Sequence, residues 1–315
     1  MYFITIDGGT TNTRLRLVSD EKVVDSIKIN IGARSGIDDK SVLKNAVKES
    51  LEKLLERNSL SESDICAITA AGMITSEFGL YNLAHICTPA GVNELANGMK
   101  KVIIDEITNI PFYFIPGVKT VGNEVCENDV MRGEEAEYVG MSEYERIDDN
   151  SVLVLPGSHS KIMSFNSDGQ ITHFKTLMTG EMICSLSQNT ILKSAVNLDV
   201  STIDEKGLKS GYAYTSEHGV NESLFKVRIL KNFMGADDES AYSFFMGAVL
   251  HDEISDIIAL DAKNVYIAGK EQIKNAMVLL LKEFSDKNVV SVPADIYENA
   301  SSAGMIKILK TGGCR

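Results

Sequence analysis

The stretch that decides the fold is YFITIDGGTTNTRLRLVSDEKVVDSIKIN, at Tyr2–Asn30. Its apolar and β-branched residues form three short runs, two of them alternating with polar residues. The runs are separated by GGTTN and SDEK, which have the composition of tight turns. The stretch therefore predicts a three-stranded β-meander whose first turn is rich in Gly and Thr.

A second block of the same plan begins about 150 residues later, at Ser151–Leu177: SVLVLPGSHSKIMSFNSDGQITHFKTL. Each block is followed by a glycine-bearing loop, IGARSG in the first half and MTGEM in the second. A helical stretch, Met182–Ser194, then follows the second loop. This is a weak internal duplication, visible in the pattern and hardly in residue identity. It predicts two similar domains that face each other.

The segments between and after these blocks alternate between strand and helix patterns, which favours the α/β class. We expect a helix over Ser41–Glu56, capped by Asp38 or Ser41, because its apolar residues fall on one stripe. Buried strands are expected at Ser63–Met73 and Asn264–Lys270. Further helices are expected at Gly91–Ile107, Glu271–Phe284 and Ile296–Leu309.

Length and charge exclude several classes of protein. A chain of 315 residues suggests two domains at roughly 100–200 residues each. A net charge of −13 leaves no basic stripe for nucleic acid. The longest apolar run, Ala276–Leu281, is too short to cross a membrane. Five scattered cysteines without a C-x-x-C pair, and a start without a signal-peptide pattern, favour a soluble cytoplasmic protein with reduced thiols.

The first motif with chemical meaning is DGGTTNTR, Asp7–Arg14, at the end of the first strand. Gly8 and Gly9 would let the backbone approach a phosphate, and Thr10, Thr11 and Asn12 would add neutral donors. Asp7 would hold Mg²⁺, which prefers one or two carboxylates together with phosphate oxygens. An ordinary Gly-rich β-turn explains the same letters equally well.

The second motif, LPGSHSK, occupies the corresponding hairpin of the second half. Gly157, Ser158, His159, Ser160 and Lys161 would surround another phosphate, with Lys161 as a point charge. A single His or Lys in a turn is more often solvated surface. The pairing with the first hairpin favours a functional role.

The third motif, NDVMRGEEAEYVGM at Asn128–Met141, predicts a helix start. Asp129 stands where an N-cap belongs, and it would also serve as a general base for a hydroxyl group. Arg132, three residues on, would lie on the same side of the helix. Glu134 and Glu135 add carboxylates beyond what a short segment needs for solubility.

Three small-residue turns complete the set of motifs. TAAGM, with Ala71, Gly72 and Met73, and MTGEM, with Thr179, Gly180 and Glu181, are suited to bind sugar hydroxyls through backbone amides and the Glu181 carboxylate. IAGK, with Ala268 and Gly269, is a turn against which an adenine would lie. Taken singly, each is more often plain packing.

Six motifs follow one another along the chain: DGGTTNTR, AGM, DVMRGEE, PGSHSK, MTGE and AGK. In this order and spacing they resemble the 2-keto-3-deoxygalactonokinase family, which belongs to the sugar-kinase, Hsp70 and actin superfamily. The resemblance implies two RNase H-like (actin-like ATPase) domains with ATP and Mg²⁺ in the cleft between them. Residues 1–148 would form the sugar-acid side and 149–315 the nucleotide side, with a C-terminal helix at about 296–315 packing back on the first domain. The implied partners are a sugar acid and a nucleotide, and a homodimer is allowed.

The implied reaction transfers the γ-phosphate of ATP to the 6-hydroxyl of 2-dehydro-3-deoxy-D-galactonate, in galactonate breakdown. Related sugar kinases carry an Asn-Asp pair at a helix start, which points to Asp129 as the base and leaves Glu134 as the alternative. Arg34 or Arg132 would hold the substrate carboxylate with two hydrogen bonds. A kinase of another small sugar or sugar acid, and a nucleotide-dependent regulatory protein without sugar turnover, stay as alternatives.

Overall fold

The computed structural model describes residues 1–37 and 39–314, which divide into two compact units. Unit 1 comprises residues 1–146, 166–173 and 295–315, and unit 2 comprises residues 147–165 and 174–294. The first division comes two residues before the predicted boundary after residue 148. Residues 166–173 were predicted in the second domain but belong to unit 1, because the amide of Ala90 donates to the Ile171 carbonyl at 3.0 Å and the reverse bond measures 2.9 Å.

Unit 1 is built on a six-stranded sheet. Its strands are β1 (Tyr2–Gly8), β2 (Thr13–Ser19), β3 (Lys22–Ile29), β4 (Ile65–Gly72), β6 (Lys100–Ile104) and β7 (Thr108–Phe114). They lie in the order β3-β2-β1-β4-β7-β6. Strand β1 pairs in parallel with β4, and β4 pairs in parallel with β7. The central strand β1 is buried over most of its length, whereas β3 alternates between exposed and half-buried residues, as expected of an edge strand.

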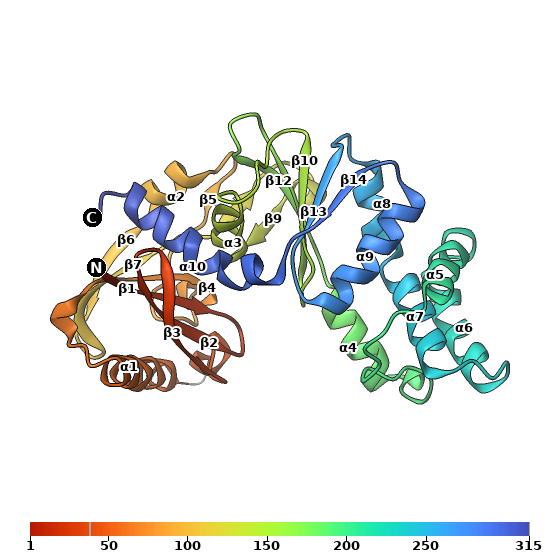
Figure 1. The fold of residues 1–315 in the computed structure, drawn as a ribbon, viewed down its shortest axis with the longest axis horizontal. Coiled ribbons are helices and arrows are strands. Elements are labelled where there is room, and N and C mark those ends of the chain that lie inside the picture. Colours follow the sequence, from red (N-terminus) through yellow and green to blue (C-terminus); the bar gives the residue numbers. More distant parts are fainter. Residues whose placement is uncertain (38, 315) are drawn as a thin grey trace. The chain divides into compact units, whose positions relative to one another are not determined.

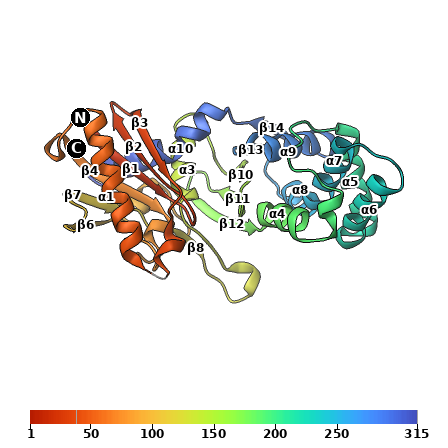
Figure 2. The same cartoon turned by 90° about the horizontal axis from the view of Figure 1, so that it is seen from below.

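Helices cover both faces of this sheet (Figures 1 and 2). On one face, Ile4 and Ile6 of β1 share a core with Val47 of α1 (Lys40–Arg57). On the other face, Phe3 packs with Ile306 of α10 (Ala294–Thr311). Because neighbouring residues of a strand point to opposite faces, Thr5 and Asp7 share the α10 face with Phe3, and the Thr5 hydroxyl meets that of Ser302 at 2.7 Å.

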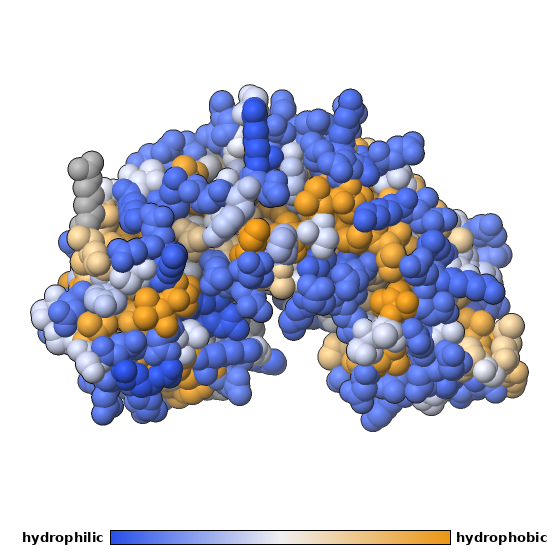
Figure 3. Space-filling model, viewed as in Figure 1, coloured by the Kyte–Doolittle hydropathy of each residue, from blue (hydrophilic) through white to orange (hydrophobic). Residues whose placement is uncertain are grey.

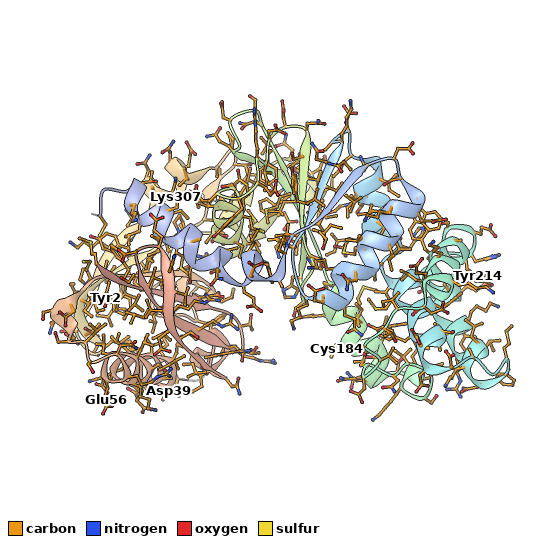
Figure 4. The ribbon with its side chains drawn as sticks, in the orientation of Figure 1. Tyr2, Asp39, Glu56, Cys184, Tyr214 and Lys307 are labelled. Atoms are coloured by element: carbon orange, nitrogen blue, oxygen red, sulfur yellow. The ribbon has the colours of Figure 1, made fainter. Side chains whose placement is uncertain are left out.

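The first helix begins at Lys40, one residue earlier than predicted. Its N-cap is Asp39, whose carboxylate accepts a hydrogen bond from the Ser41 amide at 2.8 Å. Ser41 is therefore inside the helix and not its cap, while Asp38 lies outside the described residues. Figure 4 labels Asp39 and Glu56 near the two ends of α1.

The remaining elements of unit 1 are short. They are η1 (Ala33–Gly36), η2 (Glu62–Asp64), η3 (Met73–Thr75), β5 (Ile86–Cys87), α2 (Val92–Gly98), β8 (Val118–Thr120), η4 (Val125–Glu127), β9 (Asp129–Met131) and α3 (Glu134–Met141). The predicted helix Gly91–Ile107 is wrong beyond Gly98, because KKVII forms β6 and pairs antiparallel with β7. Strands β5, β8 and β9 form a separate three-stranded sheet.

Unit 2 repeats the plan of the first. The strands of its sheet are β10 (Ser151–Leu155), β11 (Ser160–Phe165), β12 (Ile171–Leu177), β13 (Asn264–Ile267) and β14 (Asn288–Ser291), and the first three residues of β12 belong to unit 1. They lie in the order β12-β11-β10-β13-β14, which matches β3-β2-β1-β4-β7 of the first sheet position by position. The duplication predicted from the two meanders is thus a duplication of topology.

Helices make up the rest of unit 2. They are α4 (Thr179–Asn189), η5 (Ile191–Ser194), α5 (Glu205–His218), α6 (Val220–Asn232), α7 (Asp238–Val249), α8 (His251–Ala259) and α9 (Glu271–Phe284). Helix α7 lies almost wholly in the core and packs against α5. Figure 1 shows both helices beside α6. Figure 4 marks Cys184 on α4 and Tyr214 on α5.

The surface agrees with the composition. The face drawn in Figure 3 is mostly hydrophilic, with separate apolar patches. No helix among the described residues is both long and apolar enough to cross a membrane. All five cysteines are unpaired thiols.

Candidate active site

In unit 1 the first motif meets the AGM turn. Strands β1 and β4 are parallel, and their register pairs Asp7 with Ala71 and Gly8 with Gly72. Gly72 has a φ of +87°, and a Cβ there would lie 2.6 Å from the Gly8 carbonyl oxygen. Only glycine fits both restraints, so the two turns lie side by side at the carboxyl ends of the strands.

The loop IGARSG packs on the same turn. The Ala33 amide donates to the Gly9 carbonyl at 3.0 Å, and the Arg34 amide donates to the Thr10 carbonyl at 2.9 Å. A Cβ at Gly32 would come within 2.6 Å of the Gly9 carbonyl oxygen. The backbone of Arg34 is thus fixed beside the first motif, while its side chain is exposed.

The polar residues of the first turn remain near the surface. Thr10 and Thr11 are exposed, and the Asn12 side-chain amide donates to the Thr11 hydroxyl at 2.8 Å. The Gly9 amide donates to the Asn12 carbonyl at 2.8 Å and closes the turn. The turn therefore presents the two threonine hydroxyls outward.

The third motif reaches this edge through its glycine, not through Asp129. Gly133 is the N-cap of α3 with a φ of +114°, and a Cβ there would lie 3.2 Å from the Gly72 Cα. Both carboxylate oxygens of Glu135 accept the Gly133 amide at 2.8 Å. Glu134 is the first residue of the helix, and one of its oxygens accepts the Arg132 amide at 3.0 Å.

The prediction that Asp129 caps this helix is wrong. Asp129 begins strand β9, where it pairs with Thr120 of β8, and its carboxylate accepts the Val130 amide at 2.7 Å. The helix starts five residues later because the DVM segment is held in a strand by β8. Of the two candidate bases, Glu134 is the one at the helix start.

Acidic groups gather around the end of β1. Burial raises the pKa of the Asp7 carboxyl above its usual value, Arg16 and Arg14 oppose that rise, and Glu134 adds to it. The nearby carboxylate of Glu137 and burial raise the pKa of Tyr297 on α10. The end of β1 is therefore a partly desolvated site where carboxylates lie near two guanidinium groups.

Glu135, the second of the two extra carboxylates in the third motif, is a fully buried acid. Burial, assisted by Glu134, raises its pKa to about 8 against the lowering effect of its backbone hydrogen bonds and Arg132. Only the double Glu after Arg-Gly hinted at it, because burial depends on the packing of α3 in the folded unit.

Arg132 is held by the protein itself. One terminal nitrogen donates to the carbonyl and hydroxyl of Thr75 at 2.9 and 2.5 Å, and the other donates to the Leu83 carbonyl at 3.0 Å and lies 3.3 Å from the His85 ring. These bonds occupy the paired N–H groups that a bidentate carboxylate would need. Of the two predicted partners of the substrate carboxylate, Arg34 is the one with an exposed side chain.

In unit 2 the second hairpin meets the AGK turn in the same manner. Strands β10 and β13 are parallel with Val154 opposite Ile267, and the Ala268 amide donates to the Val154 carbonyl at 3.0 Å. A Cβ at Gly269 would lie 3.0 Å from the Pro156 carbonyl oxygen. The turns that follow the two strands are therefore adjacent.

The MTGE turn also packs against the second hairpin, and two of its backbone amides donate hydrogen bonds to that hairpin. The Gly180 amide donates to the Gly157 carbonyl at 3.1 Å, and the Glu181 amide donates to the Ser158 carbonyl at 3.3 Å. The Glu181 carboxylate lies 3.0 Å from the His159 ring nitrogen. The prediction that these two amides bind sugar hydroxyls is therefore corrected, since they hold the hairpin to α4.

Lys161 closes the hairpin from within. Its side chain is 3 % exposed, and its ammonium donates to the His159 carbonyl at 3.0 Å. Lys161 therefore helps to close the hairpin, and its contact with a phosphate stays a prediction. Thr179 is likewise buried, and its hydroxyl donates to Glu253 at 2.5 Å.

A cavity of about 870 Å³ opens beside the start of α9, directly after the AGK turn. Three carboxylates and two side-chain amides line it, without any Lys or Arg among the described lining residues. The Gln272 amide donates to the Val200 carbonyl and holds the opposite wall. The lining residues are Leu198, Asp199, Val200, Ser201, Thr202, Ile203, Glu239, Glu271, Gln272, Asn275, Val278 and Leu279.

A metal ion held by the protein alone is not indicated. Within residues 1–37 and 39–314, no three His, Cys, Asp or Glu side chains gather as a ligand set. Asp7 nevertheless supplies a hard oxygen donor of the kind that Mg²⁺ takes when nucleotide phosphates and water complete its shell. The residues present therefore fit a cation that arrives with the nucleotide.

Comparison with known proteins identifies the family of this chain. A family model of 2-keto-3-deoxy-galactonokinase matches residues 7–308. The chain belongs to this family. It is therefore a sugar kinase, a phosphotransferase, as the order of motifs predicted.

Individual members of the 2-keto-3-deoxy-galactonokinase family agree with this assignment. A relative from Rhizobium meliloti, described as the 2-dehydro-3-deoxygalactonokinase DgoK1, is 26% identical over 263 residues, which cover 82% of this chain and 81% of the relative. A crystal structure of a protein from Sinorhizobium meliloti, described as a 2-dehydro-3-deoxygalactonokinase, has a TM-score of 0.79 at 22% identity and covers 98% of both chains.

A more distant structure shows how widely the fold is shared. The activator of the 2-hydroxyisocaproyl-CoA dehydratase from Clostridium difficile has a TM-score of 0.52 at 13% identity, over 99% of this chain and 96% of the other. The predicted actin-like ATPase fold is thus confirmed.

Proposed function

We propose that this kinase transfers the γ-phosphate of ATP to the 6-hydroxyl of 2-dehydro-3-deoxy-D-galactonate, in galactonate breakdown. The observation that carries the proposal is the convergence of Asp7, Glu134 and the Arg34 loop on one edge of the sheet of unit 1. That edge offers a base, a cation ligand and a guanidinium group, which are the groups that phosphorylation of a sugar acid needs.

The nucleotide is assigned to unit 2. Its phosphates would lie on the hairpin of Gly157, Ser158 and His159, and its adenosine part in the cavity after Ala268–Gly269. The carboxylates of that cavity repel phosphate but accept hydrogen bonds from an adenine amino group and ribose hydroxyls. In support, the Clostridium difficile activator, which shares this fold, was solved with bound ADPNP.

The acceptor is assigned to unit 1. Arg34 would bind the substrate carboxylate, and the turns of Thr10–Asn12 and Ala71–Met73 would border the sugar acid. Glu134 would take the proton of the 6-hydroxyl as it attacks, and we place it before Asp129 because it occupies the helix start. Glu181, paired with His159, is kept as a contact that substrate binding would rearrange.

Asp7 would hold the Mg²⁺ ion that accompanies the nucleotide. The ion supplies charge neutralisation at the transferred phosphoryl group when bound. The chain itself contributes positioning, since phosphoryl transfer requires little covalent chemistry from the protein. The proposal includes a cytoplasmic location, because all five thiols are unpaired.

The test is an acceptor panel. The purified protein is incubated with ATP, Mg²⁺ and each of several keto-deoxy sugar acids, and ADP release and the site of phosphorylation are measured by coupled assay and ³¹P NMR. The proposal expects the galactonate-derived acid to be phosphorylated at its 6-hydroxyl with the highest kcat/KM. Preference for another acid would overturn the substrate, and ATP binding without turnover of any acid would overturn the activity.

A further inference from the structure

Glu253 of α8 is a buried acid that the proposed reaction does not use. Its side chain is 1 % exposed. One carboxylate oxygen accepts the Thr179 hydroxyl at 2.5 Å, while the other has no hydrogen-bond partner among the described residues. A buried polar atom without a partner costs about 1–3 kcal/mol, so its presence calls for an explanation.

The hydrogen-bond partner of Glu253, Thr179, lies at the N-terminus of a helix that follows the candidate phosphate hairpin. Thr179 is the first residue of α4, and the N-cap Met178 gives no side-chain hydrogen bond to the helix. Instead, the carbonyls of Gly157 and Ser158 accept the free amides of the first turn. The start of α4 is thus tied to the hairpin on one side and to Glu253 on the other.

Ser160 of the hairpin lies near Glu253. Its hydroxyl is fully buried and accepts the Gly157 amide at 3.4 Å. Burial raises the pKa of Glu253, whereas the Thr179 hydroxyl and, to a smaller extent, the nearby Ser160 hydroxyl lower it. The Glu253 carboxylate therefore bonds the start of α4 through Thr179, and the next two residues of that turn hold the hairpin.

We propose that Glu253 is a positioning residue, which sets the phosphate-binding hairpin Gly157–Lys161 through Thr179 and the first turn of α4. This inference rests on the proposed nucleotide site of unit 2. An apolar residue of similar size would fill the same space without the cost of a buried acid. It would, however, leave the first turn of α4, and with it the hairpin, without this anchor, and small displacements of phosphate-contacting groups weaken binding and turnover strongly.

The experiment compares ligands with and without phosphates. Dissociation constants of ADP and adenosine, melting temperatures and kinetic constants are measured for the wild type, Glu253→Met and the double variant Glu253→Met/Thr179→Val. The double variant removes the hydroxyl of Thr179 that the single change leaves unpaired. Asp252→Asn, at the exposed neighbouring position, is the matched control.

We expect ADP affinity and kcat to fall about ten- to a hundredfold in both Glu253 variants, as for groups displaced by about 1 Å. Adenosine affinity, the KM for the sugar acid and the melting temperature of the double variant should stay near wild type. Thr179→Ser, which keeps the hydroxyl, should retain ADP affinity where Thr179→Val loses it.

Two results would overturn the proposal: ADP and adenosine affinities that fall together, or a lowered melting temperature with unchanged ADP affinity. Either would make Glu253 a packing residue only. Failure of the proposed function looks different, because the wild type would then bind ADP without phosphorylating a sugar acid, and the comparison of ADP with adenosine would still test Glu253.

Discussion

Glu134, the first residue of α3, adds to the rise that burial causes in the pKa of the Asp7 carboxyl at the end of β1, while Arg16 and Arg14 oppose it. Asp7 lies at the end of a buried strand and is flanked by Arg14 and Arg16, whereas Glu134 begins α3 and accepts the Arg132 amide. We therefore assign cation binding to Asp7 and proton transfer to Glu134.

Glu134→Gln should abolish most of the activity. The amide keeps the size of the side chain and an oxygen for the Arg132 amide, but it cannot accept the proton of the hydroxyl. Loss of a general base costs about 10²–10⁴ in rate, so we expect that drop in kcat with nearly unchanged ATP binding and melting temperature. Steady-state kinetics and calorimetric titration with an ATP analogue measure these quantities.

Asp129→Asn is the matched control for this prediction. Asp129 lies in β9, and an asparagine there still offers an oxygen to the Val130 amide. Activity close to that of the wild type is expected. An inactive Asp129→Asn beside an active Glu134→Gln would return the base to Asp129.

Asp7→Asn should impair the use of Mg²⁺ more than folding. Removal of the carboxylate leaves the cation with fewer oxygen ligands, and we expect kcat to fall about a hundredfold, as when one electrostatic group of a transition state is lost. The Mg²⁺ concentration for half-maximal rate should rise as well. Full kcat at ordinary Mg²⁺ in this variant would show that Asp7 is not a metal ligand.

Much of the fold was predictable because its signals are local. The two meanders and the turns after Asp7, Leu155 and Ile267 are marked by alternation and by Gly, Ser and Thr, so their positions follow from short stretches of sequence. The equal strand orders of the two sheets then follow from the repeated pattern.

The errors arose where distant partners decide the structure. Asp129–Met131 is a strand only because β8 pairs with it, and Lys100–Ile104 is a strand only because β7 does. The helical group of α5 to α8 was not predicted; within it, α7 is buried on all sides and so lacks the single apolar stripe that marks a surface helix. Burial of Glu135 and Glu253 likewise depends on packing that no local pattern announces.

Arg34→Met should weaken binding of the sugar acid without affecting the nucleotide. A charged hydrogen bond contributes about 1.5–3 kcal/mol, so the KM for the acid should rise about ten- to a hundredfold while ATP affinity stays constant. Arg132→Met is the comparison variant, in which stability should change. It leaves the carbonyls of Thr75 and Leu83 without their donor, so its melting temperature should fall. An unchanged KM in Arg34→Met would place the carboxylate elsewhere.

Glu135→Gln should remove a pH dependence of stability. Because burial raises the pKa of Glu135 from 4.5 to about 8, the folded protein holds a proton that the unfolded chain releases between these values. Stability from this group is complete below pH 4.5, declines by about 1.4 kcal/mol per pH unit above it, and is lost above about pH 8. Glutamine keeps an acceptor for the Gly133 amide and has no proton to lose, so the free energy of unfolding of the variant should decline less steeply between pH 5 and 8. Urea denaturation across this range measures both slopes. Equal slopes in the two proteins would mean that Glu135 is ionised in the folded state at neutral pH, with Arg132 outweighing its burial.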